Sequence, residues 1–191
     1  MTPVPPLISA AADVFGVLST SGHRGCLIDG LAVQRWGEPR ATQDVDLTVL
    51  VPFGSEAAVV DDILTHIAPR TSGARTFALE RRVLLLLASN GVAIDISLAG
   101  LPFEHGVLDR SSRWKQVGAT WLPTCSAEDL IVYKLVAARP QDLVDVAGIV
   151  RRQATALDSE YVRRWGREFA ELKEDPDLLA PFETALARAG G

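Results

Sequence analysis

The chain has 191 residues, of which 48% are hydrophobic and 23% are charged, and its formal net charge is −5. This composition is typical of a folded globular protein and excludes a disordered or fibrous one. The longest apolar run, 83–88, is too short to cross a bilayer, and two cysteines are too few for a disulfide scaffold or a four-cysteine zinc site. No secretory signal is visible, so we expect a cytoplasmic protein with no membrane partner.

The first part of the chain predicts alternating helices and strands. Helices are expected at 6–20, 30–36 and 56–68. A short strand is expected at 25–29, and the alternation of polar and apolar residues over 44–51 predicts a longer one. Ser55 is placed to cap the third helix.

The next part is rich in predicted strands. Segments 82–89 and 92–98 flank Asn90-Gly91, a dipeptide that favours a type I′ turn, so they predict a hairpin. Helix and strand fit 75–81 equally well, and a further strand fits 115–121.

From Ser126 the pattern becomes helical, because Ser126 and Asp129 form a capping box for a helix that extends to Ala138. Pro140 interrupts this helix. Amphipathic segments follow at 142–153, 159–173 and 176–189. The expected fold class is therefore α/β (α+β), with a mixed β-sheet core flanked by helices over 1–124 and a C-terminal helical region over 125–191.

Asp44 and Asp46 lie two positions apart on the strand predicted at 44–51. Successive strand side chains point to opposite faces, so the two carboxylates share a face and lie within a few ångströms of each other. Like charges at this separation lower stability unless a positive group lies between them, and oxygen ligands suit Mg²⁺. The alternative is a pair of solvated acids on an exposed strand face.

Asp95 is a single carboxylate inside an otherwise apolar strand segment, 92–97. If its strand lies beside the strand of Asp44 and Asp46, the three carboxylates can form one metal cage. The alternative is an acid at the rim of the sheet or one held by structural hydrogen bonds.

Gly30 and Lys134 are the other residues with chemical potential. A glycine at a strand-to-helix junction allows backbone N–H groups to approach a phosphate, although many glycines only turn the chain. Lys134 falls in the middle of the apolar face of its helix, where an ammonium group needs an anionic partner. A snorkelling side chain or an ion pair with Asp142 or Asp145 would explain it structurally.

Together these residues resemble the nucleotidyltransferase superfamily, which has the polymerase-beta-like fold. Its signature is a Gly-Ser or Gly-Gly that opens a helix, then Asp-x-Asp on the next strand, then a third Asp on a later strand. The counterparts here are Gly30, Asp44, Asp46 and Asp95.

Two further blocks look like the minimal nucleotidyltransferases of toxin–antitoxin and abortive-infection (AbiEii-type) systems. One precedes and contains the Asp-x-Asp pair, and the other is a Lys…Arg…Asp-x-x-Asp block in the helical region. The residues that carry this likeness are Arg40, Thr42, Lys134, Arg139, Asp142 and Asp145. The resemblance covers residues 25–150.

The resemblance implies a metal-dependent enzyme that transfers an NMP from an NTP to an RNA (tRNA) or protein hydroxyl, with a cognate toxin or antitoxin as a partner. Asp44, Asp46 and Asp95 are the implied catalytic residues and ligands of Mg²⁺ or Mn²⁺. The implied nucleotide-binding residues are Gly30, Arg40, Thr42, Lys134 and Asp145.

Two residues depart from the family pattern. Leu31 replaces the small residue that usually follows the signature glycine, so it offers phosphate no hydroxyl, and Asp29 adds negative charge where a triphosphate would approach. These departures favour a competing class, a non-catalytic protein of the same fold that binds a partner. A small-molecule nucleotidyltransferase is a third class.

Overall fold

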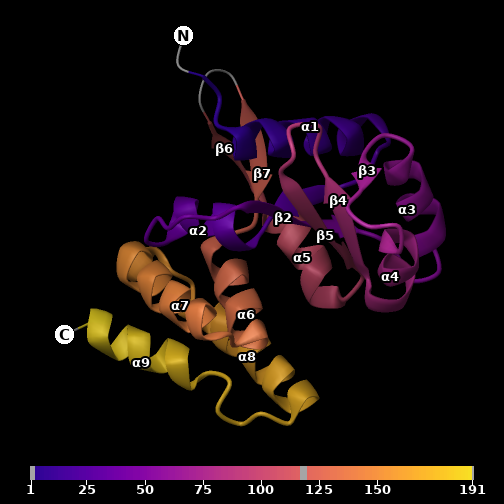
Figure 1. The fold of residues 1–191 in the computed structure, drawn as a ribbon. Helices are drawn as coiled ribbons and strands as arrows, with labels where there is room; N and C mark the ends of the chain where they lie inside the picture. The colour runs from indigo at the N-terminus through magenta and orange to yellow at the C-terminus, as the bar shows by residue number, and fades with distance from the viewer. Residues whose placement is uncertain (1–2, 117–119, 191) are drawn as a thin grey trace. The chain divides into compact units, whose positions relative to one another are not determined.

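The computed structural model describes residues 3–116 and 120–190, which form two compact units (Figure 1). The first unit comprises Met1–Leu31 and Ala41–Cys125, and the second comprises Ala32–Arg40 and Ser126–Gly191. The second unit is thus assembled from two separate stretches of chain, and the shorter one begins inside helix α2 (Asp29–Trp36). Every helix in the described part of the chain is too short or too polar to span a bilayer.

A mixed sheet of seven strands, counted over the described residues, organises the first unit. Its order is β3-β4-β5-β2-β1-β7-β6. The strands are β1 (Gly25–Leu27), β2 (Asp44–Leu50), β3 (Ala68–Pro69), β4 (Val83–Leu87), β5 (Ala93–Ala99), β6 (Ser112–Lys115) and β7 (Trp121–Thr124). The pairs β2–β5 and β1–β7 are parallel, and the other neighbours are antiparallel. The predicted fold class is confirmed.

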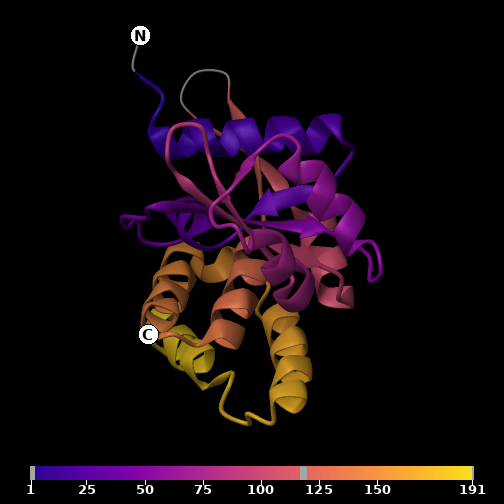
Figure 2. The same cartoon turned by 45° about the vertical axis from the view of Figure 1, so that its right-hand side comes forward.

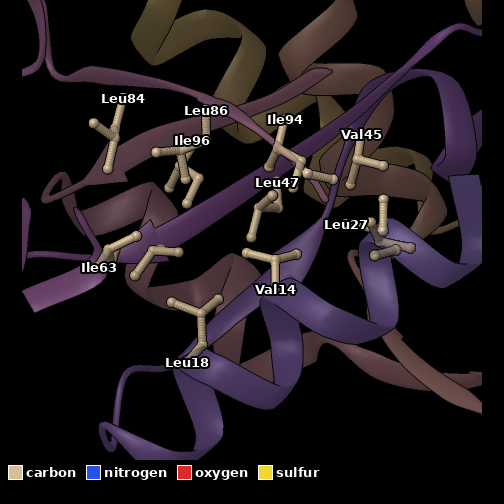
Figure 3. Close-up of a cluster of buried hydrophobic side chains, with 14 of the residues drawn as sticks. Val14, Leu18, Leu27, Val45, Leu47, Ile63, Leu84, Leu86, Ile94 and Ile96 are labelled. Atoms are coloured by element: carbon tan, nitrogen blue, oxygen red, sulfur yellow. The ribbon is translucent and has the colours of Figure 1, made fainter. Parts of the chain in front are cut away.

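The hydrophobic core of the first unit decides which face of β2 remains available for chemistry. Its helices are α1 (Pro6–Thr20), α3 (Glu56–Leu64), α4 (Ala74–Arg81) and α5 (Pro102–Arg110). Val14 and Leu18 of α1 join Leu47 of β2 in the cluster that Figure 3 shows. Because buried residues alternate with half-buried ones at the start of β2, Asp44 and Asp46 lie on the face opposite this core.

The second unit is helical, with α6 (Ala127–Ala137), α7 (Pro140–Gln153), the 3₁₀ turn η1 (Ala154–Ala156), α8 (Ser159–Lys173) and α9 (Ala180–Ala189) (Figure 2). Helix α7 packs against α6 and α9, and α6 packs against α8. The short stretch is tied to the end of α7, because Arg152 donates to the Gly37 carbonyl at 2.6 Å and Gln153 donates to the Trp36 carbonyl at 2.6 Å.

The hairpin between β4 and β5 forms as predicted, but its turn is not type I′. A type I′ turn needs positive φ at both central residues, whereas in the described loop only Gly91 has one, +82°. The Gly91 N–H donates to the Ala88 carbonyl at 2.9 Å, and the Ala88 N–H donates to the Val92 carbonyl at 2.8 Å. The connection is therefore a three-residue loop with glycine in the left-handed position.

Other predicted boundaries also change. Helix α3 ends at Leu64 rather than 68, and in the described residues Ser55 makes no side-chain cap bond to it. The ambiguous segment 75–81 is helical, as part of α4. The single strand predicted at 115–121 is wrong: its end residues belong to two different strands, since β6 stops at Lys115 and β7 starts at Trp121, and the described residues 116 and 120 lie in neither. Residues 117–119 of that prediction lie outside the described residues.

Two glycines of the first unit give a matched test of this packing. A Cβ on Gly25 in β1 would lie 2.8 Å from the Thr48 carbonyl oxygen, whereas a Cβ on the exposed Gly16 in α1 would meet nothing within 4 Å. We expect Gly25→Ala to destabilise the protein by about 1–3 kcal/mol through overpacking. Gly16→Ala should stabilise it by about 0.5–1 kcal/mol, because alanine is the better helix former. Urea unfolding checks both values, and equal effects would contradict the packing described here.

Candidate active site

Asp46 and Asp95 are brought side by side by the pairing of β2 with β5. The two strands are parallel, and Asp46 is the register partner of Asp95. Register partners on adjacent strands point to the same face and lie about 4.8 Å apart along the hydrogen-bonding direction. Asp44 lies on that face too, two residues before Asp46, and pairs with Ala93. Three half-buried carboxylates therefore line one stretch of the sheet.

This stretch of sheet has the donor set of a divalent-cation site. Carboxylate oxygens are the ligands that Mg²⁺ and Mn²⁺ prefer, and the three acids come from two strands whose register fixes their spacing. Asp95 already has a positively charged partner, the Arg70 guanidinium, whose Nη1 lies 2.8 Å from Asp95 Oδ1. The carboxylate oxygens of the three residues, all of them described, do not all lie within 4.8 Å of one another. Closing them on one ion requires side-chain rotation.

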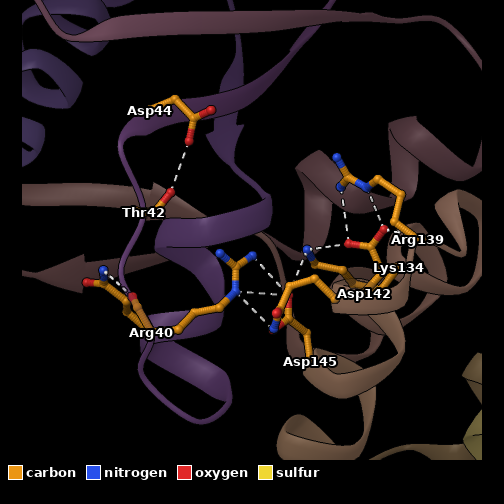
Figure 4. Close-up of polar contacts among 9 residues, drawn as sticks. Arg40, Thr42, Asp44, Lys134, Arg139, Asp142 and Asp145 are labelled. Atoms are coloured by element: carbon orange, nitrogen blue, oxygen red, sulfur yellow. Dashed lines mark hydrogen bonds and ion pairs between the residues drawn. The ribbon is translucent and has the colours of Figure 1, made fainter.

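Gly30, Thr42 and Asp44 form a second feature of the same unit. Thr42 Oγ1 donates a hydrogen bond to Asp44 Oδ1 at 3.0 Å (Figure 4). A Cβ on Gly30 would lie 2.3 Å from this same Thr42 oxygen, so only glycine leaves the space that Thr42 occupies. The structure therefore gives Gly30 a packing function beyond the phosphate contact implied by the resemblance, because it allows Thr42 to orient a carboxylate.

The local structure explains the two residues that depart from the family pattern, Leu31 and Asp29. Leu31 is 1% exposed and belongs to the hydrophobic core, so its side chain points away from any ligand on the opposite face. Asp29 has a φ of +46°, in the left-handed region that aspartate tolerates better than most residues. This conformation turns the chain sharply from β1 into α2.

Lys134 lies in the second unit, where its ammonium is buried between two carboxylates. Its Nζ lies 2.8 Å from Asp142 Oδ1 and 3.0 Å from Asp145 Oδ2, and its side chain is 2% exposed (Figure 4). This is the geometry of the structural ion pair that the sequence left open. Arg139 is the N-cap residue of α7, and the Asp142 carboxylate, at the third position of this helix, accepts the Arg139 N–H at 3.1 Å.

Arg40 joins this buried cluster from the short stretch of the second unit. Its Nε donates to Asp145 Oδ1 at 3.0 Å and its Nη2 to Oδ2 at 3.0 Å, and Gln141 donates to the same carboxylate at 3.0 Å. Arg139 contacts Asp142 in the same way, since its Nε donates to Asp142 Oδ2 at 2.6 Å. Two carboxylates are thus surrounded by three cations, and Lys134 contacts both of them.

These contacts control the protonation of the two carboxyls. Burial by itself raises the pKa of Asp142, but hydrogen bonds and charge from Arg139 and Lys134 outweigh it and leave the pKa below its ordinary 3.8. Burial likewise raises the pKa of Asp145, and hydrogen bonds from Arg40, Gln141 and Lys134 bring it below 3.8. Both groups are therefore ionised at neutral pH.

Arg70 and Gln141 are the residues of these clusters that the sequence did not indicate. Arg70 follows a two-residue strand, β3, which is too short to leave an alternating pattern. Its contact with Asp95 depends on a sheet register that spans 25 residues of sequence. Gln141 had a weak local signal, since it lies four positions before Asp145 on one helix face.

The space between Gly30 and Thr42 can be tested by substitution. Gly30→Ala should destabilise the protein by about 1–3 kcal/mol, because the new methyl group overlaps the threonine side chain. Adding Thr42→Gly should recover part of that loss, which a double-mutant cycle of urea unfolding measures as a coupling free energy. Purely additive effects would show that the two side chains do not compete for one space.

Lys134→Met tests the buried ion pair. The variant leaves Asp142 and Asp145 buried without the cation that they share, so we expect a loss of about 3–5 kcal/mol in the free energy of unfolding. The exposed pair Arg24–Asp109, at 2.7 Å, supplies the control, because Arg24→Met should cost less than about 1 kcal/mol. A Lys134→Met protein as stable as the wild type would contradict the structural function of this lysine.

The same cluster predicts that the stability of the folded protein depends on pH. The folded-state pKa of Asp142 and Asp145 lies below 3.8, so the unfolded chain binds protons more readily than the folded one. Their contribution to stability is therefore fully present above about pH 5 and is lost as pH falls through the lowered pKa values. Melting temperatures between pH 6 and pH 3 should fall less steeply for Lys134→Met than for the wild type. A steeper fall would overturn this explanation.

Comparison with known proteins extends to solved structures only, since no protein-family profile and no curated protein matches the chain. A nucleotidyltransferase-like antigenic protein from Paracoccidioides brasiliensis matches with a TM-score of 0.54 at 13% identity, over 93% of this chain and 92% of the other. The crystal structure of ANT(2'')-Ia in complex with adenylyl-2''-tobramycin matches with a TM-score of 0.53 at 15% identity, over 87% and 98% of the two chains. The solution structure of this antibiotic-resistance factor gives a TM-score of 0.51 at 15% identity, over 87% and 92%. The chain has the nucleotidyltransferase-like fold.

Proposed function

We propose that the chain is a metal-dependent nucleotidyltransferase that transfers an NMP from an NTP to a hydroxyl group of an RNA, such as a tRNA, or of a protein. The observation that carries this proposal is the parallel register of β2 and β5, which sets Asp46 beside Asp95 with Asp44 on the same face. The nucleotidyltransferase-like fold supports it, because this acidic arrangement is the one that the sequence resemblance implied.

Asp44, Asp46 and Asp95 would hold Mg²⁺ or Mn²⁺ in this protein. A metal ion held by these three residues would stabilise the charge that develops on the α-phosphate and on the leaving pyrophosphate. Thr42 fixes the orientation of Asp44 through its hydroxyl. Asp95 accepts the proton of the acceptor hydroxyl as the new oxygen–phosphorus bond forms and the bond to pyrophosphate breaks.

The nucleotide contacts belong to the same proposal. Gly30, Arg40, Thr42, Lys134 and Asp145 are the residues that we propose for NTP binding. Lys134 and Asp145 are engaged with each other, so a triphosphate that reaches Lys134 must compete with a carboxylate for its ammonium. An NTP titration of Lys134→Met separates the two functions: a weaker affinity supports the triphosphate contact, and an unchanged affinity leaves the lysine a structural residue.

Transfer of label from NTPs tests the proposed activity. The protein is incubated with each α-³²P-labelled NTP, Mg²⁺ or Mn²⁺, and total cell RNA or lysate, and we expect label on RNA or on protein. Asp46→Asn should abolish transfer by at least a hundredfold with little change in melting temperature, since it removes a carboxylate without changing shape. Thr42→Val should lower the rate more than Thr42→Ser, which keeps the hydroxyl that Asp44 accepts.

The same assay distinguishes the other classes. Tobramycin is included as an acceptor, because the ANT(2'')-Ia structure holds its adenylylated form and a small-molecule nucleotidyltransferase is the third class. NTP binding without transfer to any acceptor would favour the non-catalytic binding protein. The toxin–antitoxin setting has its own readout, namely growth arrest on expression that Asp46→Asn relieves and a cognate partner prevents.

A further inference from the structure

Arg70 is a basic residue that contacts Asp95 in the carboxylate cluster of the first unit. Its Nη1 lies 2.8 Å from Asp95 Oδ1, and its Nη2 donates to Asp95 Oδ2 at 3.3 Å. The two side chains are 31% and 29% exposed, so the pair is partly shielded from water. The Nη2–Oδ2 contact has hydrogen-bond geometry, whereas Asp95 Oδ1 is buried close to the guanidinium and accepts no hydrogen bond from the described residues.

The register of the sheet explains why Arg70 reaches Asp95. Pro69 of β3 pairs with Leu86, and the Arg70 N–H donates to the Leu85 carbonyl at 3.0 Å, which extends the β3–β4 pairing by one residue. Leu85 pairs with Asp95 on β5. Because paired residues share a face, the Arg70 side chain crosses over Leu85 on the face that carries the carboxylates.

This row of residues continues onto β2. Asp95 is the register partner of Asp46, so the order across the sheet is Arg70, Leu85, Asp95 and Asp46. Three carboxylates thus share this face with the Arg70 guanidinium. Arg70 and a divalent cation bound at this face are therefore two positive charges on one carboxylate, so each weakens the binding of the other.

We propose that Arg70 is an internal counter-ion that occupies Asp95 in the metal-free protein and competes with the divalent cation for it. Arg70 thereby sets the metal affinity of the site and holds Asp95 away from Asp44 and Asp46 until metal arrives. Arg70 is thus a positioning residue, because it acts through the Asp95 carboxylate. The inference rests on the proposed function, since it requires the metal site.

A matched control exists in the same unit. Arg75 forms a two-point contact with Asp61, at 2.6 Å from its Nε and 2.9 Å from its Nη2, with both side chains about half exposed. Asp61 lies on α3, outside the carboxylate row. Arg75→Met therefore removes an arginine–aspartate pair of the same chemistry without touching the proposed metal ligands.

The experiment measures Mn²⁺ binding to the full-length protein by electron paramagnetic resonance and by the metal-induced rise in melting temperature. For Arg70→Met we expect a lower melting temperature without metal and roughly tenfold tighter Mn²⁺ binding, the scale of one charge-assisted contact. Added Mn²⁺ should restore the melting temperature, because the cation replaces the lost arginine. Arg75→Met should bind Mn²⁺ as the wild type does, and Arg70→Lys should fall between the wild type and Arg70→Met.

The outcomes separate this inference from the proposed function. If Arg70→Met binds Mn²⁺ no more tightly than the wild type, the counter-ion function is overturned. In that case, a loss of Mn²⁺ binding in Asp46→Asn still supports the metal site itself. If neither the wild type nor either Arg70 variant binds Mn²⁺, the proposed metal site fails. Should Arg70→Met not fold without metal, Arg70→Lys carries the test, and wild-type affinity in that variant counts against the inference.

Discussion

The parallel pairing of β2 with β5 is the constraint on which the candidate site depends. A shift of one residue in that register would turn Asp95 to the face that Leu47 and Ile96 now bury. A charged group there would lack the partners that a buried carboxylate requires. The apolar residues that alternate with the acids therefore hold the acids in place, and the chemistry of one face is stabilised by the packing of the other.

Much of this face was predictable from the sequence because alternation is a local property. The strand with Asp44 and Asp46 carried a two-residue period, and Asp95 stood out as a single acid in an apolar strand segment. The family resemblance supplied the adjacency of the two strands, which these local patterns could not. Arg70 was not predictable, since its contact arises from the pairing of three strands, one of them only two residues long. The turn at Gly91 was predicted as a turn but with the wrong geometry, because loop length depends on where pairing stops.

In the helical unit, the sequence indicated some of the charged partners of the buried cluster but not all of them. The apolar sector around Lys134 indicated correctly that this lysine needs an anionic partner, and the sequence already contained Asp142 and Asp145 as candidates. What the pattern did not indicate is that Arg40, separated from Asp145 by 105 positions, is a second cation on this carboxylate. With Arg40 and Arg139 on its two sides, the buried aspartate pair becomes a closed network in which each carboxylate has more than one donor.

The helical unit is discontinuous in sequence, which affects how the chain can be divided. Between residues 31 and 126 the backbone passes from one unit to the other three times. A fragment that starts at 126 would lack Arg40 for Asp145, the Gly37 and Trp36 carbonyls that α7 residues bond, and Glu38, which lies 3.0 Å from Arg151. The C-terminal helices are thus no detachable appendage, and domain exchange between relatives would have to carry the segment 32–40 along with them.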